Sequence, residues 1–224
     1  MAFGPMMRFT VGELLIELSA FSKDDMQEFI NPGMNQFSVN RYLAQHVSHT
    51  IEDEQEWYEK VRTEKNSIKW GIWVVEGEKK TLIGESSLSD IFINDAKMHQ
   101  ATSGSVIFRK EYWGRGIASA AHKARTLYAF KHMGMHRIMS AVIHGNGGSL
   151  KALSRSGYTL VYVERNTVFV EGKARHQDNL ECLNPNQPFW NWWWNGERPT
   201  KRALEARELT KAALAWAEEN VELL

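Results

Sequence analysis

Residues 110–126 read KEYWGRGIASAAHKART, and this stretch decides the fold. Two glycines, Gly114 and Gly116, stand directly before a run of small and basic residues that predicts a helix. Glycine lets a ligand approach the main chain closely, and the first turn of a helix presents N–H groups that have no intrahelical partner. The stretch therefore predicts a binding site for an anion such as a phosphate or pyrophosphate.

Two familiar glycine motifs do not fit this stretch. A Walker loop ends in Gly-Lys-Ser or Gly-Lys-Thr, and that ending is absent here. The dinucleotide motif G-x-G-x-x-G needs glycine at position 119, where the chain has Ser119, and it belongs at the start of a parallel βαβ unit. The glycines alone leave the identity of the anion open.

The composition is that of an ordinary globular protein. The 224 residues are 43% hydrophobic and 24% charged, which suits one domain with an appendage. Because 27 basic residues balance 27 acidic ones, we expect neither nucleic acid nor a membrane surface as partner. The single cysteine, Cys182, excludes an internal disulfide and a multi-cysteine zinc site, and we expect no metal. The opening MAFGPMMRF lacks the apolar core of a signal peptide, so we expect a cytoplasmic protein.

The remaining segments predict strands and helices in a mixed order. Thr50 precedes three acidic residues, which is typical of a helix N-terminus, and Asn31-Pro32-Gly33 is expected to end an earlier helix. Expected strands cover residues 11–19, 68–75, 81–90, 103–108, 137–143, 158–163 and 167–170, and expected helices cover residues 22–30, 51–64, 117–132 and 149–156. Residues 34–49 are polar and irregular, which suits a loop or short helices that face a substrate. This order predicts an α/β fold with one twisted sheet covered by helices.

The sequence changes in character at Pro185. Residues 185–199 read PNQPFWNWWWNGERP, and their prolines and glycine argue against a regular helix. Residues 200–224 predict a helix whose apolar stripe consists of Leu209, Ala213, Trp216, Ala217, Val221 and Leu224. We therefore divide the chain into a domain at 1–184 and a tail at 185–224. We expect the tail to dock on its own domain or on a second copy, so that the protein is a monomer or a homodimer.

A second motif lies downstream of the glycines. Asn146-Gly147-Gly148-Ser149 is followed by Leu153, Gly157 and Tyr158. Together the two motifs resemble the GNAT superfamily of acetyl-coenzyme A-dependent N-acetyltransferases, whose signature at such a strand-to-helix turn is Gln/Arg-x-x-Gly-x-Gly/Ala. The resemblance covers about residues 11–183 and implies a single GNAT-like domain with a twisted, mixed and mostly antiparallel sheet.

One branch of the family is closest to this pattern. Gly116 and Ala118 match the two small positions of the signature, while Trp113 replaces the Gln or Arg. In this replacement the chain resembles the RimJ/RimL-like branch, whose members usually have the sequence YWGKG at this turn.

The resemblance implies acetyl-CoA as co-substrate. The pyrophosphate is then expected on the main-chain N–H groups of Gly114, Arg115, Gly116, Ile117, Ala118 and Ser119. The pantetheine arm carries amides, and we expect it to pair with the backbone of Val106, Ile107 and Phe108. Asn146 offers a donor and an acceptor to the same arm or to an ordered water.

The implied reaction is attack of a neutral amine on the thioester, which needs a general base and an acid for the departing thiolate. Many relatives use a tyrosine as the acid, seven residues after the asparagine, where this chain has Leu153. Ser149 is the candidate acid by its position in the branch, although it is equally placed to be the N-cap of the helix at 149–156. The base is left open between Glu85, His144 and a water relay.

The acceptor is the part about which the sequence says least. The resemblance favours a protein or peptide N-terminal α-amine, while relatives also acetylate amino acids, polyamines and antibiotics. Residues 31–49 and the hairpin near 162–172 are expected to flank the amine. The alternative from another class is a catalytically silent coenzyme A-binding module, which Trp113, Leu153 and Val168 favour.

Overall fold

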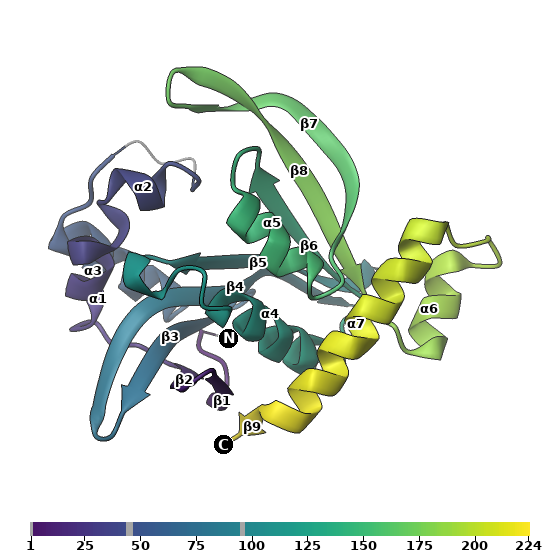
Figure 1. Ribbon diagram of the computed structural model, residues 1–224, viewed down its shortest axis with the longest axis horizontal. Coiled ribbons are helices and arrows are strands. Elements are labelled where there is room, and N and C mark those ends of the chain that lie inside the picture. The colour runs from purple at the N-terminus through teal and green to yellow at the C-terminus, as the bar shows by residue number, and fades with distance from the viewer. Residues whose placement is uncertain (1, 44–46, 95–96) are drawn as a thin grey trace.

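A computed structural model describes residues 2–43, 47–94 and 97–224, so residues 44–46 of the expected substrate-facing segment lie outside the described part. The centre of the fold is one twisted sheet with strand order β7-β8-β6-β5-β4-β3-β2-β1-β9 (Figure 1). Its strands are β1 (Met7–Val11), β2 (Leu14–Ser19), β3 (Ile68–Glu76), β4 (Lys79–Asn94), β5 (Lys97–Ile107), β6 (Arg137–Ile143), β7 (Thr159–Val170), β8 (Lys173–Leu183) and β9 (Glu222–Leu223).

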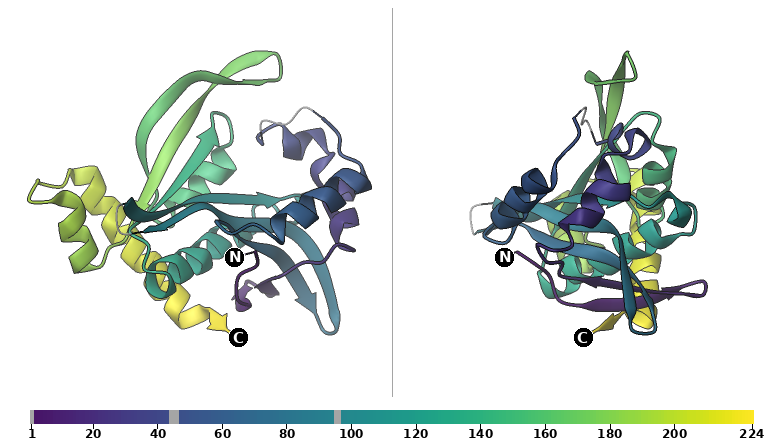
Figure 2. Two further views of the ribbon diagram at one scale, coloured as in Figure 1. Left: turned by 180° about the vertical axis from the view of Figure 1, so that it is seen from behind. Right: turned by 90° about the vertical axis from the view of Figure 1, so that its left-hand side faces the viewer.

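Helices lie on both faces of this sheet (Figure 2). They are α1 (Met26–Glu28), α2 (Phe37–Asn40), α3 (Ile51–Val61), α4 (Ile117–Leu127), α5 (Gly147–Ser154), α6 (Gln187–Trp194) and α7 (Lys201–Asn220), with the π-helical turns η1 (Phe29–Met34) and η3 (Tyr128–His132) and the 3-10 turn η2 (Lys110–Tyr112). α1 and α3 cover one face, and α4, α5 and α7 cover the other. Among the helices of the described ranges, none is long and apolar enough to cross a membrane.

The pairing of β5 with β6 creates the opening on which the site depends. These strands run parallel, and their ladder joins Gln100–Thr102 to Arg137–Met139. Beyond the ladder β5 continues to Ile107 and β6 continues to Ile143, and the two strands diverge (Figure 1). Backbone groups in the diverging parts are therefore left for partners other than the neighbouring strand.

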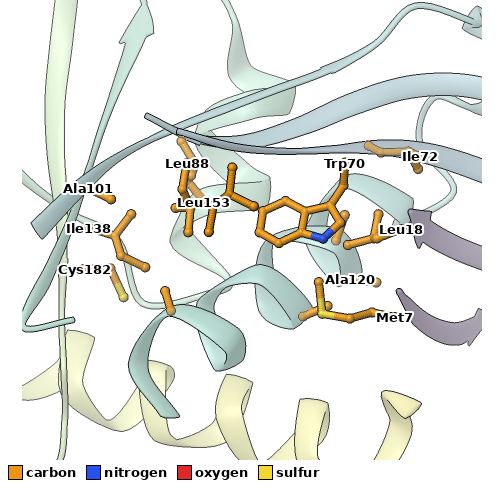
Figure 3. Packing of buried hydrophobic residues seen from close by; sticks show 14 of the residues in the cluster. Met7, Leu18, Trp70, Ile72, Leu88, Ala101, Ala120, Ile138, Leu153 and Cys182 are labelled. Carbon is orange, nitrogen blue, oxygen red and sulfur yellow. The ribbon is translucent and has the colours of Figure 1, made fainter. Parts of the chain in front are cut away.

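The core on the α4 side of the sheet surrounds the buried indole of Trp70 (Figure 3). The indole Nε1 donates to the carbonyl of Pro5 at 2.9 Å, so this large side chain is buried without an unpaired donor. Cys182 lies at the other end of the same core, and burial raises the pKa of its thiol to about 12. Its thiol is therefore protonated at neutral pH and belongs to the packing.

Several predicted elements are confirmed with small changes of length. Thr50 caps α3 as predicted, since its hydroxyl accepts from the N–H of Asp53 at 3.3 Å and the Asp53 carboxylate accepts from the N–H of Thr50 at 2.8 Å. The backbone and hydroxyl of Thr50 lower the pKa of Asp53. The helix after the glycines continues through η3 to His132, as predicted.

Four predicted elements near the ends of the domain differ from the structure in their bounds. The strand expected at 11–19 is β2, which begins three residues later, because Gly12 adopts a φ of +61° and turns the chain out of the preceding strand β1, which was not predicted. Asn31-Pro32-Gly33 does not end its helix but lies inside η1. The strands expected at 158–163 and 167–170 are one strand, β7, whose register against β8 shifts between Glu164 and Val168.

The Trp-rich segment corrects a further prediction. It contains the helix α6, although its prolines and glycine were expected to exclude one. Pro188 stands in the first turn, where the missing N–H has no intrahelical partner to lose. Asn195 and Gly196 follow the helix with positive φ angles, so they end it instead of interrupting it.

The last helix docks within the chain. α7 packs against α4, with Ala213 and Ala217 buried in the contact, and β9 then pairs with β1 at the edge of the sheet. The stripe is narrower than predicted, because Leu209 and Leu224 are exposed while Thr210 is buried.

Candidate active site

The turn between β5 and α4 has the geometry that an anion site requires. Gly114 and Gly116 have φ angles of +75° and +89°, a region that favours glycine. Gly116 is the N-cap of α4, so the N–H groups that follow it point out of the helix start. The indole Nε1 of Trp113 donates to the carbonyl of Ile107 at 2.7 Å and ties the turn to the end of β5. The turn thus presents main-chain donors and the positive end of the helix dipole.

A cavity of about 510 Å³ opens against this turn. It is bounded by the start of α4, the end of β5, the loop after β6, the start of α5 and the end of α2. The residues expected at the site that line it are Val106, Ile107, Gly114, Gly116, Ile117, Ala118, Ser119, Asn146 and Ser149. The two motifs, which stand thirty residues apart in the sequence, therefore meet in one cavity of the size that small-molecule ligands occupy.

Two of the residues expected to bind the coenzyme, Phe108 and Arg115, are not among the residues that line the cavity, although the main chain of Arg115 belongs to the glycine turn. Phe108 is fully buried against Phe29, and its N–H donates to the carbonyl of Ile83 at 2.9 Å, so its backbone donor is already used. Arg115 is exposed outside the lining, with its guanidinium 5.5 Å from the ring centroid of Tyr112. The strand therefore ends one residue earlier than the prediction assumed.

Asn146, and not Ser149, is the residue that caps α5. The side chain of Asn146 accepts from the N–H of Ser149 at 3.2 Å, which makes Asn146 the N-cap of α5. The expectation that Ser149 is the cap is therefore wrong, because α5 begins two residues earlier than the predicted helix. Ser149 lines the cavity, and its hydroxyl does not cap the helix.

The two candidate bases lie outside the lining that the structure describes. Glu85 faces the α3 side of the sheet and pairs with Lys69 at 3.3 Å. His144 follows the end of β6, directly before the lining residue Gly145, and its Nε2 lies 2.7 Å from a carboxylate oxygen of Asp178. The structure thus brings His144, but not Glu85, next to the cavity.

The charge of the cavity wall is positive. Arg41, Lys151 and Arg155 line it, and the lining in the described ranges contains no aspartate or glutamate. Across the opening, the hydroxyl of Tyr42 donates to the carbonyl of Gly145 at 3.0 Å, which joins the end of α2 to the loop after β6. A positive wall beside the anion turn suits a ligand that carries several phosphates.

His122 and Arg125 are functional candidates that the sequence reasoning missed. His122 lines the cavity with 4% of its surface exposed, and Arg125 is completely buried beneath it. The sequence did contain a signal for them, namely their spacing. One face of the predicted helix carries Ala118, His122, Arg125 and Ala129. Two basic side chains in an apolar stripe call for a specific partner.

The hydrogen-bond donors and charges around the cavity suit coenzyme A. The glycine turn offers main-chain N–H groups for phosphates, the three basic side chains add charge, and the end of β5 borders the space with its backbone where β6 has diverged. In the described part of the chain, no group of three or more histidine, cysteine or acidic side chains could hold a metal ion.

Comparison with known proteins agrees with this geometry. The family model of the GNAT acetyltransferase domain matches residues 16–159. A Bacillus subtilis protein named "Probable N-acetyltransferase YjcK" is 28% identical over 155 residues, which cover 67% of this chain and 81% of that protein. The chain therefore belongs to the GNAT acetyltransferase family, and it is an acetyl-CoA-dependent N-acetyltransferase.

Two solved structures share the fold. Mycobacterium smegmatis RimJ in complex with CoA-disulfide superimposes with a TM-score of 0.68 at 16% identity, covering 99% of this chain and 96% of that one. The spermidine N-acetyltransferase of Vibrio cholerae, in complex with CoA and spermine, gives a TM-score of 0.66 at 18% identity, covering 75% of this chain and 95% of that one. At these identities the likeness shows the fold alone, so the acceptor of this chain has to be inferred from its own site.

Proposed function

We propose that this protein transfers the acetyl group of acetyl-CoA to the α-amine of a protein or peptide N-terminus. The observation that carries the choice of acceptor is the positive cavity wall. A polyamine carries several positive charges, and Lys151 and Arg155 repel them without a lining carboxylate in the described residues to compensate. The charge of Arg41 is partly offset by Glu171, which lies outside the lining. The attacking amine is neutral in either acceptor, but the rest of a peptide backbone is uncharged and presents a row of carbonyl acceptors.

Arg41 is the residue that supports peptide recognition most directly. It lines the cavity at the end of α2, and its Nη1 donates to a carboxylate oxygen of Glu171 at 2.8 Å. Its Nε is buried and has no acceptor in the described part of the chain. A buried donor without a partner is costly, and a peptide carbonyl entering the cavity satisfies it.

The roles of the site residues in this proposal follow from their positions. The N–H groups after Gly116 hold the pyrophosphate, and the end of β5 aligns the amide arm. The amine nitrogen attacks the thioester carbon, the C–S bond breaks, and Ser149 gives a proton to the departing sulfur. His144, oriented by Asp178, is our proposed base in place of Glu85, which Lys69 already holds.

An amine panel tests the acceptor. Purified protein is incubated with acetyl-CoA and one of three amines: spermidine, a free amino acid, or a short peptide with a free N-terminus and its lysines blocked. We expect release of coenzyme A thiol with the peptide at a kcat/KM at least about tenfold above that with spermidine, because several kcal/mol of charge repulsion oppose the polyamine. Thiol release that is faster with spermidine or with the amino acid would contradict the peptide proposal.

Replacing Ser149 by alanine tests the proposed acid. We expect kcat to fall at least about tenfold, while the affinity for coenzyme A and the free energy of unfolding stay unchanged, because Asn146 supplies the helix cap. Ser154→Ala, at the end of the same helix and outside the cavity lining, is the matched control and should keep full activity. Wild-type kcat in Ser149→Ala would show that solvent protonates the thiolate.

A further inference from the structure

Arg125 is a buried cation whose hydrogen-bond partners in the described part of the chain are neutral groups. It lies on the face of α4 that packs against the sheet, and none of its surface is exposed. Its Nη1 donates to the Ser86 hydroxyl at 2.9 Å and to the Gly104 carbonyl at 2.6 Å, and its Nη2 lies 2.6 Å from Nδ1 of His122. Gly104 stands two residues past the β5–β6 ladder, where the strands diverge. Arg125 thus supports the backbone at the start of the opening.

The contact with Arg125 fixes the state of the His122 ring. A guanidinium group has donors and no acceptor, so Nδ1 of His122 must accept the hydrogen bond. The remaining ring proton is then on Nε2. Burial and the charge of Arg125 hold the pKa of His122 well below its usual value, so the ring stays neutral at physiological pH. His122 is consequently a neutral side chain with a single N–H donor in a set position.

His122 lines the part of the cavity that follows the anion turn along α4. His122 is three residues past Ser119, or about 4.5 Å further along the axis of α4. Through Arg125 it is joined to Gly104, the neighbour of the lining residue Ser105 on β5. His122 therefore lines the space between α4 and the sheet, where a ligand held at the turn by its phosphates must continue as a chain.

We propose that Nε2–H of His122 donates a hydrogen bond to a carbonyl oxygen of the pantetheine arm, and that Arg125 is the positioning residue that fixes this donor. The inference rests on the proposed binding of the coenzyme in this cavity, since it assigns the pantetheine arm to one end of it. A neutral N–H suits an amide or thioester oxygen, which carries partial charge only, whereas the N–H groups and the dipole at the start of α4 suit the phosphates.

Binding measurements with two ligands test this assignment without the reaction. Calorimetry compares coenzyme A with adenosine 3′,5′-bisphosphate, which has the nucleotide but lacks the pantetheine arm. We expect His122→Leu to weaken coenzyme A binding about tenfold and to leave binding of the bisphosphate unchanged, because the leucine removes the donor and leaves the carbonyl without one. His122→Gln keeps a donor at the end of the side chain and should restore affinity to within about threefold of wild type.

Long-range proton–nitrogen correlation on the unaltered protein gives a readout that does not depend on a variant. The His122 ring should show the proton on Nε2 both with and without coenzyme A. A proton on Nδ1, or equal coenzyme A affinity in wild type and His122→Leu, would overturn the assignment while leaving the coenzyme site intact. Failure of the wild-type protein to bind either ligand would overturn the coenzyme site itself, and this inference with it.

Discussion

Replacing Gly116 by valine is expected to weaken coenzyme A binding at least about a hundredfold while the protein stays folded. The φ of Gly116 is +89°, and a β-carbon built there meets only an ordinary contact at 3.7 Å, with Cγ1 of Val11. The cost to folding is therefore the left-handed backbone, about 1–2 kcal/mol. The cost to binding is larger, because the side chain occupies the space through which a phosphate reaches the N–H groups of α4.

The control for this variant is Gly77, a glycine that also has a positive φ angle but lies away from the cavity. Gly77 turns β3 into β4 with a φ of +61°, nothing lies within 4 Å of an added β-carbon, and the residue is not part of the cavity lining. Gly77→Val should lose a similar free energy of unfolding and keep its affinity for coenzyme A, as calorimetry and chemical denaturation would measure. Equal affinity in folded Gly116→Val and wild type would mean that the phosphates bind elsewhere.

The contrast between these two glycines shows what local sequence can predict. The turn at Gly114 and Gly116 was predictable because its chemistry is contained in a few neighbouring residues, namely small side chains and the start of a helix. Thr50 was predictable for the same reason, since a capping box spans only four residues. Such features need no information about distant parts of the chain.

Features that depend on distant segments were missed or misjudged. Phe108 was expected at the coenzyme because it continues a strand, and nothing local shows that its N–H is used by Ile83 of a neighbouring strand. The hydrogen bond of Tyr42 to Gly145 joins residues that are 103 positions apart. The prediction for α6 was wrong for a different reason. Its prolines were treated as residues that break a helix, without regard to the place of Pro188 in the first turn.

His122 and Arg125 illustrate a third limit. Their spacing on α4 was visible in the sequence, but its meaning depends on Ser86 and Gly104, which belong to two other strands. Only the folded arrangement shows that the guanidinium has neutral acceptors and that the ring must carry its proton on Nε2. A polar pair in an apolar stripe thus marks a position to examine, and the tertiary partners decide its role.

The largest expected effect on stability comes from Gly157→Ala, which tests whether the tail at 185–224 is an integral extension of the domain, as we propose. Gly157 follows α5 with a φ of +85°, and α7 passes directly over it. A β-carbon there would lie 1.9 Å from Oγ1 of Thr210, 2.7 Å from the Thr210 nitrogen and 2.9 Å from the Ala206 carbonyl oxygen. Two of these atoms are backbone, so relief requires movement of the helix itself. We expect the free energy of unfolding to fall by about 3 kcal/mol, the sum of overpacking and left-handed strain.

Gly172→Ala separates the two contributions. Gly172, in the turn between β7 and β8, has a φ of +74° and no atom within 4 Å of an added β-carbon, so its replacement carries the backbone strain without the clash. Chemical denaturation of both variants should therefore give a clearly larger loss for Gly157→Ala. Because α7 also buries Ala213 and Ala217 against the domain, its displacement exposes apolar surface, and the Gly157 variant should aggregate on heating at a lower temperature than the Gly172 variant. Equal losses in the two variants would mean that α7 does not rest on Gly157 in solution and that the tail is a separate arm.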